Sequence, residues 1–130
     1  MKAEGGKEDL TTRTRRFALA VIRLYSGLPK TTEAQVIGKQ LLRSGTSVGA
    51  HYREATRARS AAEFVSKVDG GRQELEETMY WLELLREGGG IKEEGRSLRQ
   101  MIEPLYREAD ELMAILTTCA RNAKNRRNSR

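Results

Sequence analysis

The spacing of apolar residues limits most what this chain can fold into, because they recur at steps of three and four along four segments. This period matches one face of an α-helix, and the alternation of two that indicates a half-buried β-strand is absent. The clearest stripe consists of Ala34, Ile37, Leu41, Ser44, Val48, His51, Ala55 and Ala58. The sequence therefore predicts an all-α protein.

Start and stop signals divide the chain into four helices. Thr32 with Gln35, and Ser60 with Glu63, have the spacing of a capping box, and glycines at 27 and 88–90 mark two ends. The predicted helices cover about residues 9–27, 32–58, 60–87 and 92–123. Short links place successive helices antiparallel, so we expect one domain, 1–123, folded as an up-down-up-down antiparallel four-helix bundle. Residues 124–130 have no apolar anchor and are expected to form a basic, disordered tail.

Two interruptions leave the helix pattern open to question. Gly70 and Gly71 stand inside the third segment, but the apolar phase continues across them, which favours one continuous helix. Pro104 stands inside the fourth segment, where a kink and a helix that restarts at Pro104 are both compatible with the sequence.

The middle of the second segment is built from small residues, between Ser44 and Ala50. A helix this thin lets a neighbouring helix approach closely, or leaves room for a large side chain. Trp81, Phe64 and Tyr80 are the candidates for such a side chain.

Charge is distributed unevenly along the chain, which has a net charge of +6. Residues 1–59 hold 12 Lys/Arg and 5 Asp/Glu, residues 60–111 hold 7 and 13, and residues 112–130 hold 5 and none. This asymmetry suits a phosphate-bearing partner or, equally, subunits that pair opposite charges. The candidate residues for nucleic-acid binding are Arg13, Arg15, Arg16, Arg23, Arg121, Lys124, Arg126 and Arg127. The same residues also suit a solvated face and a solubilising tail, unless antiparallel packing merges them into one patch.

Several kinds of site have no support in the sequence. The chain has one cysteine, Cys119, and one histidine, His51, so it cannot assemble a Cys/His zinc site. It has no Walker loop, no GxGxxG turn and no Glu-x-x-His pair, so we predict no metal and no cofactor. It also has no apolar run of about 20 residues and no apolar signal-peptide core, so we expect a cytoplasmic protein without a membrane partner.

Polar residues of the second and third segments form a further constellation. Ser47, His51 and Glu54 share one helical face, but this face carries the bundle seam, so we expect hydrogen-bonded structural groups there and no catalytic triad. Buried charges need partners. The predicted structural polar network consists of Arg43, Ser47, His51, Glu54, Glu74 and Glu77.

The stretches QLLRSGTSVGAHYREATRARSAAEF, at 40–64, and ELEETMYWLELL, at 74–85, also carry a family resemblance. They resemble the four-helix-bundle proteins encoded by intervening sequences in 23S ribosomal RNA genes, a family that includes accessory proteins of diversity-generating retroelements. The resemblance implies a homopentamer. For the retroelement members it implies basic rings that bind nucleic acid and assist a reverse transcriptase.

These observations favour a non-enzymatic oligomeric bundle that binds RNA or DNA through basic surfaces, as a scaffold for a ribonucleoprotein or a reverse transcriptase. The alternative is a structural or protein-interaction module that binds no nucleic acid.

Overall fold

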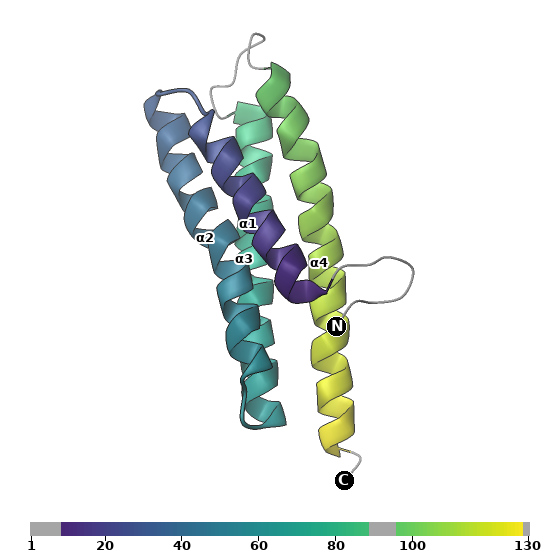
Figure 1. The fold of residues 1–130 in the computed structure, drawn as a ribbon. Helices are drawn as coiled ribbons and strands as arrows, with labels where there is room; N and C mark the ends of the chain where they lie inside the picture. Colours follow the sequence, from purple (N-terminus) through teal and green to yellow (C-terminus); the bar gives the residue numbers. More distant parts are fainter. Residues whose placement is uncertain (1–8, 89–95, 129–130) are drawn as a thin grey trace.

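The computed structural model describes residues 9–88 and 96–128, and it contains four helices and no strand in those ranges (Figure 1). The helices are α1 (Leu10–Ser26), α2 (Thr32–Thr56), α3 (Ala61–Gly88) and α4 (Arg96–Asn128). The all-α fold class is therefore confirmed. None of the helices in the described ranges combines the length and the apolar character that a membrane span requires.

The helices pack side by side as an antiparallel bundle. The long helices α2 and α3 pack against each other, α4 packs against α3, and the shorter α1 lies against α2 and α4. In Figure 1, α1 covers only the upper half of the bundle, and the C-terminal half of α4 continues below the end of α1. The up-down-up-down order follows from the short links, as the sequence predicts.

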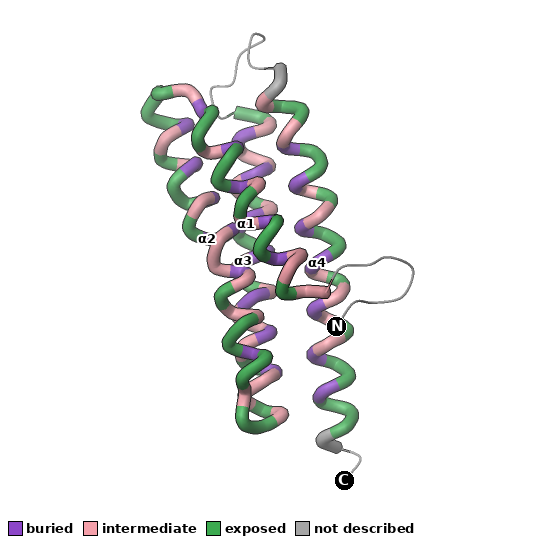
Figure 2. Tube along the Cα trace, in the orientation of Figure 1, coloured by how far each residue is buried: buried purple, intermediate pink, exposed green. Residues whose placement is uncertain are grey.

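The core is made by the predicted apolar stripes, which face one another from all four helices (Figure 2). Its largest fully buried side chains are Phe17, Val21, Leu24, Leu41, Val48, Val68, Leu75, Leu82, Leu85, Ile102, Leu112 and Leu116. Each buried leucine or phenylalanine contributes about 1.5–3 kcal/mol relative to an exposed one. Burial of these stripes is what holds the helices together.

Side-chain caps fix the starts of three helices. The Asp9 carboxylate accepts a hydrogen bond from the Thr12 amide at 2.9 Å, and the Ser60 hydroxyl accepts one from the Glu63 amide at 3.0 Å. The cap of α2 is Thr31, which accepts from the Ala34 amide, so the predicted cap at Thr32 is one residue late. The side-chain amide of Gln35 donates to the Pro29 carbonyl oxygen, and its backbone amide donates to the Thr31 carbonyl oxygen.

Both interruptions lie inside continuous helices. Helix α3 passes through Gly70 and Gly71, and a Cβ at position 70 would lie 2.7 Å from the His51 ring, so this glycine makes room for the histidine. Helix α4 passes through Pro104, which excludes a helix that restarts there. Pro104 is exposed, so its ring meets solvent on the outer face of the bundle.

Helix α4 also continues to Asn128. The prediction of a disordered tail is therefore wrong for residues 124–128. Ala120 and Ala123 are both 3% exposed and hold this end of the helix against the bundle. Lys124 and Arg126 follow, and basic residues in the last turns of a helix interact favourably with its dipole. Residues 129 and 130 lie outside the described part.

Gly45 and Gly49 of α2 face α1, which agrees with the first of the two alternatives, close approach of a neighbouring helix; the residues next to these glycines are Val21 and Thr14, and not Trp81, Phe64 or Tyr80. A Cβ on Gly45 would lie 2.8 Å from Val21 Cγ2, and a Cβ on Gly49 would lie 3.2 Å from the Thr14 hydroxyl. Buried Ser44 faces Thr78 of α3, with 2.9 Å between their hydroxyl oxygens. The thin stretch therefore serves close helix approach, chiefly of α1.

Candidate nucleic-acid interface

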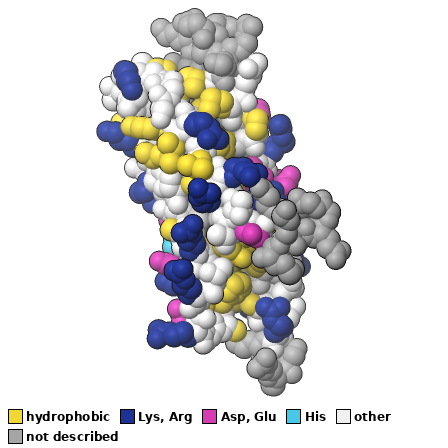
Figure 3. Space-filling model, viewed as in Figure 1, with side chains coloured by type: hydrophobic (Ala, Val, Ile, Leu, Met, Phe, Trp, Pro, Cys, Tyr) yellow, Lys and Arg dark blue, Asp and Glu magenta, His cyan; other side chains and the backbone are white. Residues whose placement is uncertain are grey.

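The two halves of the bundle carry opposite excess charge. Residues 9–59, which include α1 and α2, hold 10 Lys/Arg and 3 Asp/Glu. The acidic residues are concentrated on α3 and the first half of α4. Figure 3 shows Lys and Arg side chains outnumbering acidic ones over the face formed by α1 and α2. We call this face the α1–α2 face.

Arg13 is bound within the bundle and does not suit phosphate contact. Its guanidinium donates two hydrogen bonds of 2.8 Å to Glu108 and one of 2.6 Å to Glu111. The side chain is only 17% exposed, and hydrogen bonding to Glu108 is the main cause that raises the pKa of Arg13 above its usual value. The structure therefore removes Arg13 from the candidate phosphate-binding residues and makes it a link between α1 and α4.

The other candidate arginines of α1 are exposed. Arg16 and Arg23 line an open groove of about 360 Å³ between α1 and α4, with Phe17 and Met101 among its apolar walls. Arg15 points to the other side of α1, into a groove shared with α2. Arg15 and Arg23 form no ion pair with any residue in the described ranges.

The basic residues of α4 form a separate group. Arg121, Lys124 and Arg126 are exposed on the last turns of the helix, whereas the side chain of Arg127 lies outside the described part. The start of α1 lies beside Glu108, and Arg121 is about 20 Å further along α4 by the helical rise. The ends of α1 and α4 therefore do not merge into one basic patch.

Two exposed arginines at the C-terminal end of α2, Arg53 in its last turn and Arg57 at its C-cap, belong to the α1–α2 face but were not among the sequence candidates. Arg53 lines the groove beside Arg15, and Arg57 follows it one helical turn later. Neither has an ion-pair partner within 9–88 and 96–128. Their spacing of four residues, which places them on one helical face, is the sequence signal that could have identified them.

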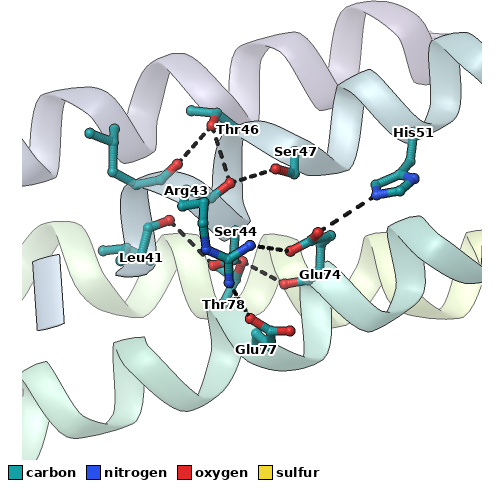
Figure 4. Close-up of polar contacts among 10 residues, drawn as sticks. Leu41, Arg43, Ser44, Thr46, Ser47, His51, Glu74, Glu77 and Thr78 are labelled. Carbon is teal, nitrogen blue, oxygen red and sulfur yellow. Dashed lines mark hydrogen bonds and ion pairs between the residues drawn. The ribbon is translucent and has the colours of Figure 1, made fainter. Parts of the chain in front are cut away.

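Part of the predicted polar network connects α2 and α3 (Figure 4). Arg43 donates to Glu77 at 2.6 Å and lies 3.6 Å from Glu74, and His51 Nε2 lies 3.6 Å from the other Glu74 oxygen. Arg43 is 53% exposed and Glu77 48%, so their pair lies at the bundle surface, whereas Glu74, between Arg43 and His51, is only 16% exposed.

Two predicted members do not join the network. The Ser47 hydroxyl donates to the Arg43 carbonyl oxygen of its own helix, and so does not engage His51. Glu54 is exposed and pairs with Lys67 at 3.2 Å. Ser47, His51 and Glu54 share one face of α2, but each side chain has a different partner, so they do not form a hydrogen-bonded trio. No group of three metal-ligating side chains was found among the described residues.

The sequence and the fold both match known proteins. A family described as 23S rRNA-intervening sequence protein matches residues 7–118. The chain belongs to this family. The crystal structure of a protein of unknown function from the S23 ribosomal protein family of Bacteroides thetaiotaomicron VPI-5482 has 34% sequence identity and a TM-score of 0.75. That match covers 86% of this chain and 98% of the other. No curated protein matches the chain.

Membership of the 23S rRNA-intervening sequence protein family accounts for the fold and for the resemblance at residues 40–64 and 74–85. It assigns no activity, because the matched structure is itself described as having unknown function. For this member of the family, the role of each charged residue therefore has to be argued from its own contacts.

The ion pairs of Arg13 and Arg43 should differ in their effect on stability. Arg13→Met removes the three hydrogen bonds that a 17% exposed guanidinium donates to Glu108 and Glu111, so we expect the free energy of unfolding to fall by about 1–3 kcal/mol. Arg43→Met removes a half-exposed pair, so we expect a fall of less than about 1 kcal/mol. Urea denaturation of both variants measures this difference. A larger loss for Arg43→Met than for Arg13→Met would contradict the assignment.

Proposed function

We propose that this protein is a non-enzymatic, homo-oligomeric bundle that binds RNA or DNA without sequence specificity, mainly through the α1–α2 face. A second contact is provided by Arg121, Lys124, Arg126 and Arg127 at the end of α4. The observation that carries the proposal is the excess of 10 basic over 3 acidic residues in 9–59, where Arg15, Arg23, Arg53 and Arg57 form no ion pair with another described residue.

The chemistry of these side chains suits the nucleic-acid backbone. Arginine presents a planar fork of donors that matches phosphate oxygens, and it keeps its charge throughout the physiological pH range. Each phosphate contact releases condensed counterions, which makes the affinity strongly dependent on salt. Contacts to phosphate carry no base information, so binding should be insensitive to sequence.

A salt titration of the wild-type protein tests this proposal. Binding of labelled single-stranded RNA and DNA should be measurable at about 50 mM salt and fall steeply toward about 200 mM, with similar slopes for unrelated sequences. Fluorescence anisotropy measures both the affinity and the slope. An absence of binding at the lower salt concentration, or an affinity that salt does not change, would refute the proposal.

The bundle would act in the cytoplasm as a scaffold, in a ribonucleoprotein or beside a reverse transcriptase, as the resemblance to retroelement accessory proteins suggests. The pentamer implied by the same resemblance is part of this proposal. A ring of subunits would repeat the α1–α2 face and raise the avidity for a long nucleic acid without any new contact.

A second candidate function is favoured by the opposite charges of the two halves. A basic α1–α2 face on one subunit could pair with the acidic surface of α3 and α4 on another, which would give an interaction module without nucleic-acid binding. Native mass spectrometry separates the cases. Both predict an oligomer, five times the 14.7 kDa subunit mass for a pentamer, but only pairing through the charged faces predicts that moderate salt dissociates it.

A further inference from the structure

We propose that the groove between α1 and α2 is a phosphodiester-binding site in which Arg15 and Arg53 hold one phosphate of a nucleic-acid strand from two sides. This inference rests on the proposed function and goes beyond it, because it assigns the contact to one place on the α1–α2 face. The groove is open and has a volume of about 260 Å³.

The shape of the groove comes from small side chains. Gly49 and Ala50 of α2 lie on its walls, with hydroxyl-bearing Thr46 one turn earlier. Larger residues at these two positions would fill the space between the helices. The volume is several times the roughly 30 Å³ that one water occupies in the liquid, so a hydrated anion can enter.

The charges around the groove favour an anion. Arg15 enters from α1 and Arg53 from α2, and no acidic residue of the described chain lines it. Both arginines are exposed, and neither makes an ion pair with a residue in 9–88 or 96–128. Arg13, Arg43 and Arg86, in contrast, are each within 2.8 Å of a glutamate oxygen. The two groove arginines therefore keep their charge and their donors available to a ligand.

Among the residues that the structure describes, the acidic one at the start of α1 is Asp9, which caps the helix. Asp9 accepts a hydrogen bond from the Thr12 amide, and this bond is the main cause that lowers the pKa of Asp9 below its usual value. The positive end of the α1 dipole lies here beside the negative end of α2, whose last turn holds Arg53, so the two dipoles offset each other and the attraction for an anion comes from the two arginines.

Continuity with the rest of the α1–α2 face favours a strand over a single free anion. Arg57 lies one turn beyond Arg53, about 6 Å further along α2 by the helical rise, and is also unpaired among the described residues. A strand held in the groove could therefore continue along α2 to a second cation. A free phosphate would gain nothing from Arg57.

Substitutions in the groove test the assignment. Arg15→Gln and Arg53→Gln should each weaken binding of single-stranded RNA about tenfold, the loss expected for one charge-assisted hydrogen bond. Each should also lower the slope of log affinity against log salt by about 0.7. Ala50→Leu, which fills the groove and changes no charge, should reproduce the loss. Arg107→Gln removes an exposed charge of α4 outside the groove and should leave the slope unchanged.

The outcomes separate the site from the function. If the wild-type protein binds RNA and Arg15→Gln, Arg53→Gln and Ala50→Leu all bind it as tightly as the wild type does, the groove assignment is overturned and the general function stands. If wild-type protein binds no RNA, the proposed function itself fails. An equal loss for Arg107→Gln would show that only total charge matters, and would also overturn the site.

Inorganic phosphate distinguishes the two sources of the anion. The proposal predicts that millimolar phosphate at constant ionic strength neither displaces RNA nor raises the melting temperature through Arg15 and Arg53. Phosphate stabilisation that both arginine variants abolish, together with unchanged RNA binding in those variants, would make the groove a free-anion site and overturn the phosphodiester assignment. Melting temperatures of all variants in phosphate-free buffer serve as the folding control.

Discussion

Leu75→Ala is expected to lower the free energy of unfolding by about 2–5 kcal/mol. Leu75 lies at the middle of α3 and is 0% exposed, in the core cluster to which all four helices contribute. The substitution removes buried apolar contact and leaves a cavity inside the close-packed core. Urea denaturation followed by far-UV circular dichroism measures the loss.

Leu19→Ala is the matched control, because Leu19 is 42% exposed on the outer face of α1. We expect a change within about 0.5 kcal/mol there, as at other surface positions. Similar losses for the two variants would mean that the stripe containing Leu75 does not form the interior.

Gly45→Leu is expected to lower the free energy of unfolding by about 2–3 kcal/mol. A side chain at position 45 has no free space, because its Cβ alone would lie 2.8 Å from Val21 Cγ2 and 3.0 Å from Val21 Cγ1. Val21 is 0% exposed and β-branched, so it cannot rotate away cheaply. Helix α1 must shift outward, and amide hydrogen exchange should then become faster in α1 than in α3.

Gly71→Ala is the control for helix propensity. A Cβ at position 71 would lie 3.5 Å from Leu116 Cδ1, which is ordinary contact, so the substitution should be neutral or stabilise by up to about 1 kcal/mol. If Gly45→Leu were as stable as the wild type, the close approach of α1 to α2 would not be a requirement of the fold.

Most of the fold could be predicted from local signals. The helices and their buried faces follow from a period that needs no knowledge of neighbours, and the phase across Gly70 and Gly71 was enough to predict a continuous α3. The orientation of the small residues could not be predicted in this way. A glycine such as Gly45 is compatible with a close approach of any neighbouring helix, and only the packed bundle shows that the neighbour is α1.

The candidate interface could be predicted only in part, because the partner of a charged side chain depends on the register between helices. Nothing in the local sequence distinguishes Arg13, which is held by Glu108, from Arg15 two residues later, which has no ion-pair partner in the described part of the chain. Glu54 likewise pairs with Lys67 and not with the network at Glu74. Arg53 was missed because it lies in the second segment, outside the basic cluster at 13–23.

Mapping of ultraviolet crosslinks between single-stranded RNA and the wild-type protein tests the central claim most directly. The charge distribution predicts crosslinked peptides from residues 9–59, with a smaller number from the end of α4, at about 50 mM salt. Crosslinks concentrated in residues 61–111, the acidic half of the bundle, would contradict the assignment of the α1–α2 face as the nucleic-acid interface.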